Sequence, residues 1–323
     1  MSAEELGLSG RVGLALGSGA ARGWAHVGVI RALAENGIEP DVISGTSMGA
    51  VVGAAYAAGQ IEGFEAWARE LEWRQVVSYL DLSFRGGLLN ARRLFGFFED
   101  ALPGRSIDSL GLPFAAVGTD LANGQEVWMR EGDLLEALRA SIALPGLITP
   151  SQWQGRWTLD GGLVNPVPVS LCRALGADSV IAVDLNTTLL HRRFESAGES
   201  PAAAQAEPAA FGKSPPDENA PLGARLNGVL REFAADIRAR IGSDAPDDGP
   251  SMPGLYEVMA NAVNIMQVRI GRSRMAGDPP ELLITPRMHD FAILDFDRAA
   301  QAIDEGRRAV ARAIAVQDVA SRP

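Results

Sequence analysis

The sequence predicts an α/β fold, in which a mostly parallel central sheet is covered by helices. Three observations lead to this prediction. Short apolar runs rich in β-branched residues alternate with helical patterns across the first 185 residues. Two of the helical patterns end at a glycine, Gly37 and Gly59, and glycine is a common stop signal for helices. A chain of 323 residues, of which 47% are hydrophobic, can also bury a sizeable core.

The predicted elements follow one another as strands and helices. The helix at 24–36 shows the pattern well, because Val27, Ile30 and Leu33 recur at helical spacing. The segment 50–58 is almost entirely small and apolar, so its helix must be buried against the sheet. The remaining predictions are strands at 11–16, 41–44, 113–118, 126–130, 156–159, 179–184 and 281–285, and helices at 167–175, 222–241, 255–275 and 296–316.

The chain is predicted to form a single domain, residues 1–323, whose core comprises about 11–190 and 255–316. Two segments, 191–221 and 243–253, are rich in small, acidic and proline residues and contain too few large apolar side chains to build a core. We predict that they are flexible insertions.

Charge and residue usage argue against several classes of function. The net charge of -11 repels nucleic acid, so no nucleic-acid partner is expected. The single cysteine, Cys172, excludes an intrachain disulfide. His26, His191 and His289 lack ligand-like spacing, so neither a metal nor another cofactor is expected. An acidic N-terminus and the lack of long apolar runs predict no signal peptide and no membrane span. We expect a cytoplasmic protein, with peripheral contact to a membrane left open.

A nucleophile motif lies between the second predicted strand and the following helix. Residues 45–49, Gly-Thr-Ser-Met-Gly, have the G-x-S-x-G form. Gly45 and Gly49 leave room for a tight turn that forces Ser47 into a strained conformation, and the helix N-terminus favours negative charge beside it. Ser47 is therefore the candidate nucleophile.

A glycine-rich turn follows the first predicted strand. Residues 17–23, Gly-Ser-Gly-Ala-Ala-Arg-Gly, can direct several backbone N–H groups at an anion. A dinucleotide fingerprint would need glycine in place of Arg22, so a nucleotide site is disfavoured. Two interpretations stay open. One is a close turn that packs a helix on the sheet, and the other is an oxyanion hole in which the amides around Gly19 and Ala20 act with that of Met48.

Asp160 is the candidate base. It follows the strand predicted at 156–159 and precedes Gly161 and Gly162, which allow a close approach of backbones. An Asp-Gly pair alone is usually only a turn. Beside a serine elbow and an anion-binding loop, however, Asp160 is the best candidate to accept the Ser47 proton.

Taken in this order, the three motifs resemble the patatin-like phospholipase family, in particular its bacterial members. The segments 139–145 (RASIALP) and 265–280 (IMQVRIGRSRMAGDPP) are similar to the same proteins, and the resemblance covers about residues 11–312. It implies a three-layer α/β/α fold, a Ser/Asp dyad, and calcium-independent hydrolysis of acyl esters of lipids or phospholipids. The site residues that it implies are Ser47 and Asp160 as the catalytic pair, Gly17, Ser18, Gly19, Ala20, Arg22, Gly23 and Met48 around the oxyanion, and Gly45, Gly49, Gly161 and Gly162 as motif glycines.

The glycine-rich loop departs from the family pattern at Ser18 and Ala20, where the family usually has glycine. Backbone amides can serve an oxyanion whatever the side chain, but an alanine tolerates positive φ poorly. Arg22 has two candidate roles, positioning the loop or pairing with a substrate phosphate, and the first is slightly favoured.

Three other functions stay open. An α/β-hydrolase triad would use Ser47, Asp160 and the late His289. A noncatalytic lipid-binding or regulatory module would keep the elbow without turnover, and a nucleotide-binding module would use the glycine-rich loop alone. The apolar segment 88–98 (LLNARRLFGFF) would form an acyl pocket, a membrane-facing lid or, more simply, a core helix.

Overall fold

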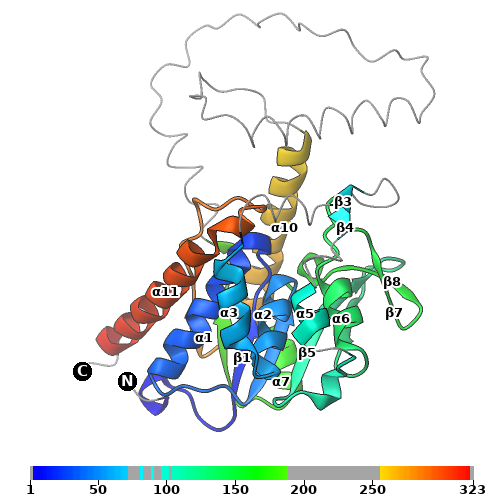
Figure 1. Ribbon diagram of the computed structural model, residues 1–323. Helices are drawn as coiled ribbons and strands as arrows, with labels where there is room; N and C mark the ends of the chain where they lie inside the picture. Colours follow the sequence, from blue (N-terminus) through cyan, green and yellow to red (C-terminus); the bar gives the residue numbers. More distant parts are fainter. Residues whose placement is uncertain are drawn as a thin grey trace, which may run out of the picture. The chain divides into compact units, whose positions relative to one another are not determined.

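The computed structural model describes residues 3–71, 81–82, 89–90, 96–101, 104–187 and 255–320. The chain forms two compact units, one of Met1–Arg192 with Met266–Pro323 and the other of Arg193–Ile265. Only residues 255–265 of the second unit are described, and the account below concerns the first unit (Figure 1). The two predicted insertions and the helix predicted between them lie outside the described residues, so the single-domain organisation stays a prediction.

The described chain contains an eight-stranded mixed sheet and a separate two-stranded pair. The strands are β1 Val12–Leu16, β2 Val42–Thr46, β3 Asp81–Leu82, β4 Leu89–Asn90, β5 Phe114–Asp120, β6 Glu126–Met129, β7 Ser151–Trp153, β8 Arg156–Asp160, β9 Ser179–Val183 and β10 Leu282–Ile284. Strands β10, β9, β1, β2 and β5 are neighbours in this order and run parallel, which confirms the predicted mostly parallel arrangement. β6 and β8 pair antiparallel with β5, β7 pairs antiparallel with β8, and β3 pairs with β4.

The pairing of β5 places the ends of two other strands together. Val117 of β5 pairs with Thr46 of β2. The next residue, Gly118, pairs with Asp160 of β8, and both β5 residues also pair with β6. A strand residue has one neighbour on each edge, so β6 occupies one edge of β5 while β2 and then β8 occupy the other. The carboxyl ends of β2 and β8 therefore meet along one edge of β5.

Helices cover both faces of the sheet, as Figure 1 shows. They are α1 Ala25–Glu35, α2 Met48–Ala57, α3 Ile61–Arg69, α5 Gly96–Ala101, α6 Leu134–Ser141, α7 Val169–Ala174, α10 Leu255–Gly277 and α11 Ala299–Ala320. Successive side chains of a strand point to opposite faces. Leu14 and Leu16 of β1 belong to the core formed with α1, α2 and α11, whereas Ala15 between them packs with α7. The three-layer α/β/α fold is confirmed.

The helices match the predictions more closely in type than in position. α2 begins at Met48, two residues before its predicted start, and a 3-10 turn at Ala20–Trp24 precedes α1. The strand β7 and the helices α3 and α6 were not predicted. None of the described helices is long and apolar enough to cross a membrane.

The helix α11 lies against α1 through two glycines. A Cβ added to Gly28 would lie 1.8 Å from the carbonyl oxygen of Ile303, and a Cβ added to Gly306 would lie 2.0 Å from that of Ala25. Real Cβ atoms never approach backbone so closely. Any larger residue at either position must therefore push the two helices apart.

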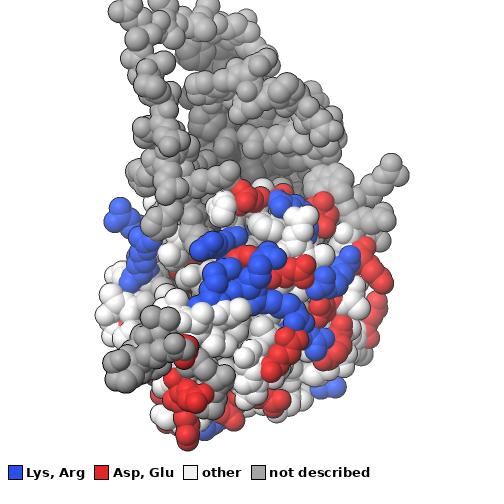
Figure 2. Space-filling view, turned by 90° about the vertical axis from the view of Figure 1, so that its left-hand side faces the viewer, with Lys and Arg blue, Asp and Glu red and all other residues white. Residues whose placement is uncertain are grey.

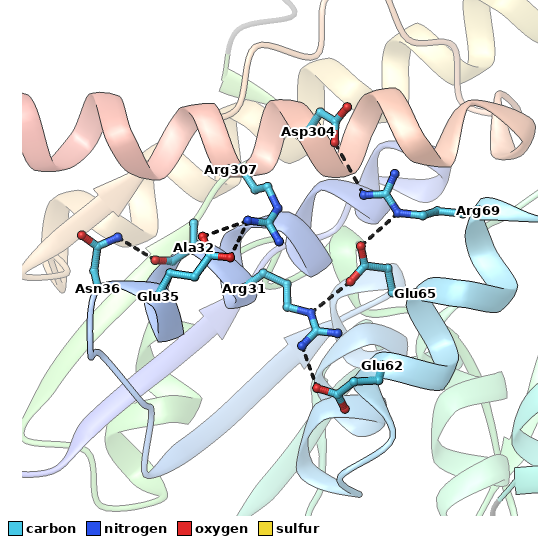
Figure 3. Close-up of polar contacts among 9 residues, drawn as sticks. All are labelled: Arg31, Ala32, Glu35, Asn36, Glu62, Glu65, Arg69, Asp304 and Arg307. Carbon is cyan, nitrogen blue, oxygen red and sulfur yellow. Dashed lines mark hydrogen bonds and ion pairs between the residues drawn. The ribbon is translucent and has the colours of Figure 1, made fainter.

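Arginine and carboxylate side chains alternate on the surface formed by α1, α3 and α11. Arg307 binds Glu35 at 2.7 Å, and Arg31 bridges Glu62 at 2.6 Å and Glu65 at 3.0 Å (Figure 3). Figure 2 shows basic and acidic side chains adjoining one another on this side of the molecule. These two arginines are partly exposed and already paired, so each pair contributes little stability and the positive charge is largely neutralised.

Candidate active site

Ser47 lies on a sharp turn between β2 and α2. Its backbone has φ 56° and ψ -126°, a conformation that costs a residue with a side chain about 1–3 kcal/mol. The flanking glycines are required by close contacts. A Cβ on Gly45 would lie 2.4 Å from the Cα of Ala50. A Cβ on Gly49 would lie 2.2 Å from the carbonyl oxygen of Leu16. The strained turn predicted from the G-x-S-x-G motif is present.

The carboxylate of Asp160 lies beside the Ser47 hydroxyl. Ser47 Oγ donates a hydrogen bond to Asp160 Oδ2 at 2.5 Å, although 113 residues separate the two in the sequence. Asp160 Oδ1 accepts the amide of Gly162 at 2.7 Å. A Cβ on Gly161 would lie 2.3 Å from the carbonyl oxygen of Val117, so the turn can approach β5 only with glycine there. The structure thus brings the candidate nucleophile and the candidate base together.

Burial changes the pKa of Asp160. Ser47 is 6% exposed and Asp160 is 2% exposed. Burial raises the pKa of Asp160 from 3.8 to about 6, and the hydrogen bonds from Ser47 and Gly162 partly oppose that rise. At neutral pH the carboxylate is therefore ionised but more basic than an ordinary aspartate, as a general base should be.

The segment that ends α6 holds both residues by their backbones. Ser141 Oγ accepts the amide of Ser47 at 2.9 Å and donates to the carbonyl oxygen of Val117 at 2.7 Å. Two residues later, the carbonyl oxygen of Ala143 accepts the amide of Asp160 at 2.9 Å. One short segment therefore sets the separation of the two strand ends. The sequence similarity at 139–145 pointed to this stretch but assigned no role to Ser141.

The glycine-rich loop packs directly against the elbow. A Cβ on Gly23 would lie 2.5 Å from the Cβ of Met48. On its other side the loop adjoins β9, where a Cβ on Gly17 would lie 2.6 Å from the carbonyl oxygen of Val183. The amides of the loop and the N-terminus of α2 are consequently neighbours.

Two loop amides, those of Gly19 and Ala20, have no hydrogen-bond acceptor among the described residues. Ala20 has φ 47°, the strained conformation that an alanine tolerates poorly. Met48 opens α2, where no intrahelical acceptor exists for its amide. Four other loop amides bond to backbone carbonyls, Gly17 to Val183, Ser18 to Pro166, Ala21 to Ile293 and Arg22 to Gly19.

Arg22 is buried, and its side chain turns back into the loop. Its Nε donates to the carbonyl oxygen of Gly19 at 3.1 Å. Burial lowers the pKa of Arg22 to about 10, against an opposing effect of Asp184, so the side chain keeps its charge at neutral pH. This contact favours the loop-positioning role over a role in binding a substrate phosphate.

The side chain of Ser18 is tied to two residues that the sequence did not single out. Ser18 Oγ donates to Gln267 Oε1 at 3.1 Å. Asn186 Nδ2 donates to the Ser18 carbonyl oxygen and to Ser18 Oγ, each at 3.2 Å. Gln267 lies in the segment 265–280, whose similarity to family members was a signal without an assigned role. Asn186 follows β9 and belongs to no motif.

The two histidines that the structure describes, His26 and His289, are not part of the Ser47–Asp160 contact. His289 Nε2 lies 3.1 Å from Asp290 Oδ2. Ser47, in contrast, donates its hydrogen bond directly to the carboxylate of Asp160. His26 is buried with Nε2 at 2.7 Å from the Gly17 carbonyl oxygen, and burial lowers its pKa to about 4. It supports the glycine-rich loop as a neutral side chain.

In the described ranges, no three histidine, cysteine, aspartate or glutamate side chains group so as to hold a metal ion. Most of the apolar segment 88–98 lies outside the described residues, and none of the side chains of this segment is described. The pocket, lid and core-helix interpretations of that segment all stay predictions.

Comparisons with known proteins give the chain its family. A family model described as patatin-like phospholipase matches residues 14–173, which contain the glycine-rich loop, the elbow and Asp160. An uncharacterized NTE family protein of Mycobacterium tuberculosis is 35% identical over 345 residues, covering 95% of this chain and 92% of its own. Human patatin-like phospholipase domain-containing protein 6 is 33% identical over 189 residues, covering 54% of this chain and 13% of its own. The crystal structure of VipD from Legionella pneumophila aligns with a TM-score of 0.44 and 12% identity over 95% of this chain and 66% of that one. The family model, together with the mycobacterial match over nearly the whole chain, shows that the chain belongs to the patatin-like phospholipase family, a membership that implies a hydrolase acting on lipid acyl esters.

Proposed function

We propose that this chain hydrolyses acyl esters of lipids through a Ser47–Asp160 dyad and an acyl-enzyme intermediate. The observation that supports the proposal most strongly is the buried hydrogen bond from Ser47 Oγ to Asp160 Oδ2 at 2.5 Å. A serine hydroxyl becomes an effective nucleophile when an adjacent base removes its proton, and this carboxylate is already in contact with that proton.

In the first step, Ser47 Oγ attacks the ester carbonyl carbon while its proton passes to Asp160. A serine hydroxyl is a far weaker acid than a carboxyl group with a pKa of about 6, so the proton moves together with the attack. The raised pKa of Asp160 narrows the difference in acidity between the carboxyl group and the serine hydroxyl. When the tetrahedral intermediate collapses, Asp160 returns the proton to the leaving alcohol, and the acyl group stays on Ser47.

In the second step, water hydrolyses the acyl-enzyme. Asp160 takes a proton from the water while the water oxygen attacks the acyl carbonyl carbon. When the tetrahedral intermediate collapses, Asp160 passes this proton to Ser47 Oγ and the carboxylic acid departs. The amide of Gly162 holds the carboxylate through Oδ1 in both steps, so Oδ2 stays directed at the serine.

We assign the oxyanion of both tetrahedral intermediates to the amides of Gly19, Ala20 and Met48. The lack of an acceptor for the two loop amides among the described residues supports this assignment, as does the contact between Gly23 and Met48. Each donor of such a hole typically contributes about 3 kcal/mol of transition-state stabilisation.

The substrate class follows from the family and not from a pocket. Membership in the patatin-like phospholipase family supports lipid esters as substrates, and we propose a carboxylic ester hydrolase of the phospholipase A or lysophospholipase type. Peripheral contact with a membrane, where such substrates reside, and a cytoplasmic location are parts of the same proposal.

The first experiment compares the wild type with Ser47→Ala, Asp160→Asn and His289→Ala on a short-chain chromogenic ester. Circular dichroism checks that all four are folded. We expect the first two variants to lose at least about 100-fold in kcat/KM and His289→Ala to keep wild-type activity. For the wild type, kcat/KM should rise with pH through about 6 and then level off, because the base must be ionised.

Each other outcome points to a different function. Equal loss in His289→Ala would support the α/β-hydrolase triad instead. An inactive wild type that still binds phospholipid vesicles would support the lipid-binding module. With activity established, release of fatty acid from phospholipid and from lysophospholipid, each with and without a calcium chelator, tests the substrate type and the expected calcium independence.

A further inference from the structure

The two unpaired amides of the glycine-rich loop must point in a fixed direction if they are to bind an oxyanion. A trans peptide is planar, and its C=O and N–H groups point in opposite directions. Fixing the carbonyl of a peptide therefore also orients its amide. The amide of Gly19 shares a peptide with the carbonyl of Ser18, and the amide of Ala20 shares one with the carbonyl of Gly19.

The second of these peptides is held by Arg22. Both the backbone amide and the Nε of Arg22 donate to the Gly19 carbonyl oxygen at 3.1 Å. Two donors on one oxygen fix the plane of the peptide, so the Ala20 amide is directed away from Arg22.

The first peptide is held by Asn186. Its Nδ2 donates to the Ser18 carbonyl oxygen at 3.2 Å and lies at the same distance from Ser18 Oγ and from Gln267 Oε1. Asn186 is itself fixed by its backbone amide, which donates to Asp184 Oδ1 at 2.8 Å beyond the end of β9. The side-chain amide therefore reaches the loop from a rigid base.

The burial of Asn186 leaves one of its polar atoms without a hydrogen-bond partner among the described residues. Asn186 is 2% exposed, and its Oδ1 has no hydrogen-bond partner among the described residues. A buried acceptor without a partner costs about 1–3 kcal/mol. A residue chosen only for stability would satisfy this atom or be apolar, so the orphaned oxygen indicates that the donor end of Asn186 serves another purpose.

Ser18 and Gln267 complete the same cluster. Ser18 Oγ donates to Gln267 Oε1 at 3.1 Å, and Gln267 is 6% exposed on α10. A glycine in place of Ser18, the usual residue of the family, would have no hydroxyl for this bond. The departure of the loop from the family pattern thus coincides with an added side-chain attachment.

We propose that Asn186 is a positioning residue that orients the Gly19 amide towards the oxyanion by holding the Ser18 carbonyl, with Ser18 and Gln267 bracing the contact. The proposal rests on the proposed function and adds to it a residue that acts through the loop. The hydrogen bonds of Asn186 go to Asp184, Ser18 and Gln267, and none goes to Ser47 or Asp160. Its removal should weaken binding of the transition state and leave binding of the ground-state ester unchanged.

The test is Asn186→Ala, measured by kcat and KM on the short-chain ester and by the Ki of a trifluoromethyl ketone. Such a ketone adds Ser47 Oγ to its carbonyl and forms a tetrahedral oxyanion, so its affinity reports on the hole. We expect kcat to fall about 10-fold at constant KM and Ki to rise by the same factor, a part of the about 100-fold loss when a donor is removed outright.

Asn36→Ala is the matched control. Asn36 Nδ2 also donates to a backbone carbonyl, that of Ala32 at 2.7 Å, but Asn36 directly follows the C-terminal end of α1, whereas the loop precedes the N-terminal end of this helix (Figure 3). We expect its kcat and Ki to equal those of the wild type. A lower melting temperature for Asn186→Ala with kcat and Ki unchanged would overturn the proposal.

Ser18→Gly keeps the test decisive if Asn186→Ala fails to fold. It removes one hydroxyl and no backbone donor, and we expect it to lower kcat and raise Ki in parallel, by about 3-fold. A fully active Ser18→Gly would then refute the brace. Failure of the proposed function is distinguishable, because in that case the wild type is inactive or Ser47→Ala keeps its activity.

Discussion

Replacing Asp160 with asparagine should stabilise the folded protein while it abolishes activity. Burial raises the pKa of Asp160 from 3.8 to about 6. Between about pH 4 and pH 6 the folded state therefore binds a proton that the unfolded state has released, so stability falls as pH rises through this window. A rise of about two pKa units corresponds to about 3 kcal/mol in the free energy of unfolding. The folded protein is less stable by this full amount above about pH 6 than it is below about pH 4.

Asparagine removes the charge and keeps the geometry. Its amide oxygen can accept the Gly162 amide, and its nitrogen can donate to Ser47 Oγ, in place of the two contacts of Asp160. We expect Asp160→Asn to be more stable than the wild type by about 1–3 kcal/mol at pH 8, and by close to zero at pH 4, where the wild-type carboxyl is protonated.

Urea unfolding of both proteins at several pH values between 4 and 8 measures this difference. All other titrating groups are common to the two proteins, so their contributions cancel in the comparison. A difference that does not change with pH, or an Asp160→Asn protein less stable than the wild type at pH 8, would refute the reasoning. Loss of esterase activity in the same preparation shows that the stabilised protein has lost its base.

Two further predictions concern other parts of the structure. Ser141→Ala removes the acceptor of the Ser47 amide and should lower kcat at least about 10-fold at a cost in stability of about 1–3 kcal/mol. Ser44→Ala, which deletes an equally buried hydroxyl bonded to the Pro168 carbonyl, should cost similar stability but keep kcat; equal kcat losses would show that Ser141 acts only through folding. Gly306→Ala would place a Cβ 2.0 Å from a backbone oxygen of α1 and should destabilise the protein by at least about 2 kcal/mol in urea unfolding. Gly277→Ala, with no atom within 4 Å of the added Cβ, should cost little, and an equally stable Gly306→Ala would contradict the close helix contact.

The elbow could be predicted from the sequence because its causes are local. Glycine is required at position 45 because a Cβ there would clash with the backbone of Ala50, five residues away. Both residues lie in one strand–turn–helix segment. The strand and helix patterns on either side are also local properties of the chain, so the strained Ser47 follows from a short stretch of sequence. For the same reason the strand predicted before Asp160 matches β8 within one residue.

The supports of the site could not be predicted, because they depend on contacts between distant segments. Asn186 reaches Ser18 across 168 residues and Gln267 across 81, and no spacing rule connects an asparagine after a strand to a glutamine on a later helix. Ser141 lies at the end of a helix that the periodicity did not reveal. The direction of β8 is likewise absent from its five residues, since a short strand reads the same whether it runs parallel or antiparallel.

The direction of β8 explains how the proposed dyad could act without a third residue. In a triad, a histidine lies between nucleophile and carboxylate and must be oriented by that carboxylate. Here β2 and β8 run towards each other along one edge of β5, so Ser47 and Asp160 emerge from facing strand ends. Each is anchored by its own backbone amide, one to Ser141 and the other to Ala143. The short side chain of Asp160, held this firmly, has little conformational freedom to lose in the transition state, so the proposed dyad requires no intervening imidazole. The cost is a strained serine and a buried charge, and the extra stability of Asp160→Asn would measure the second of these directly.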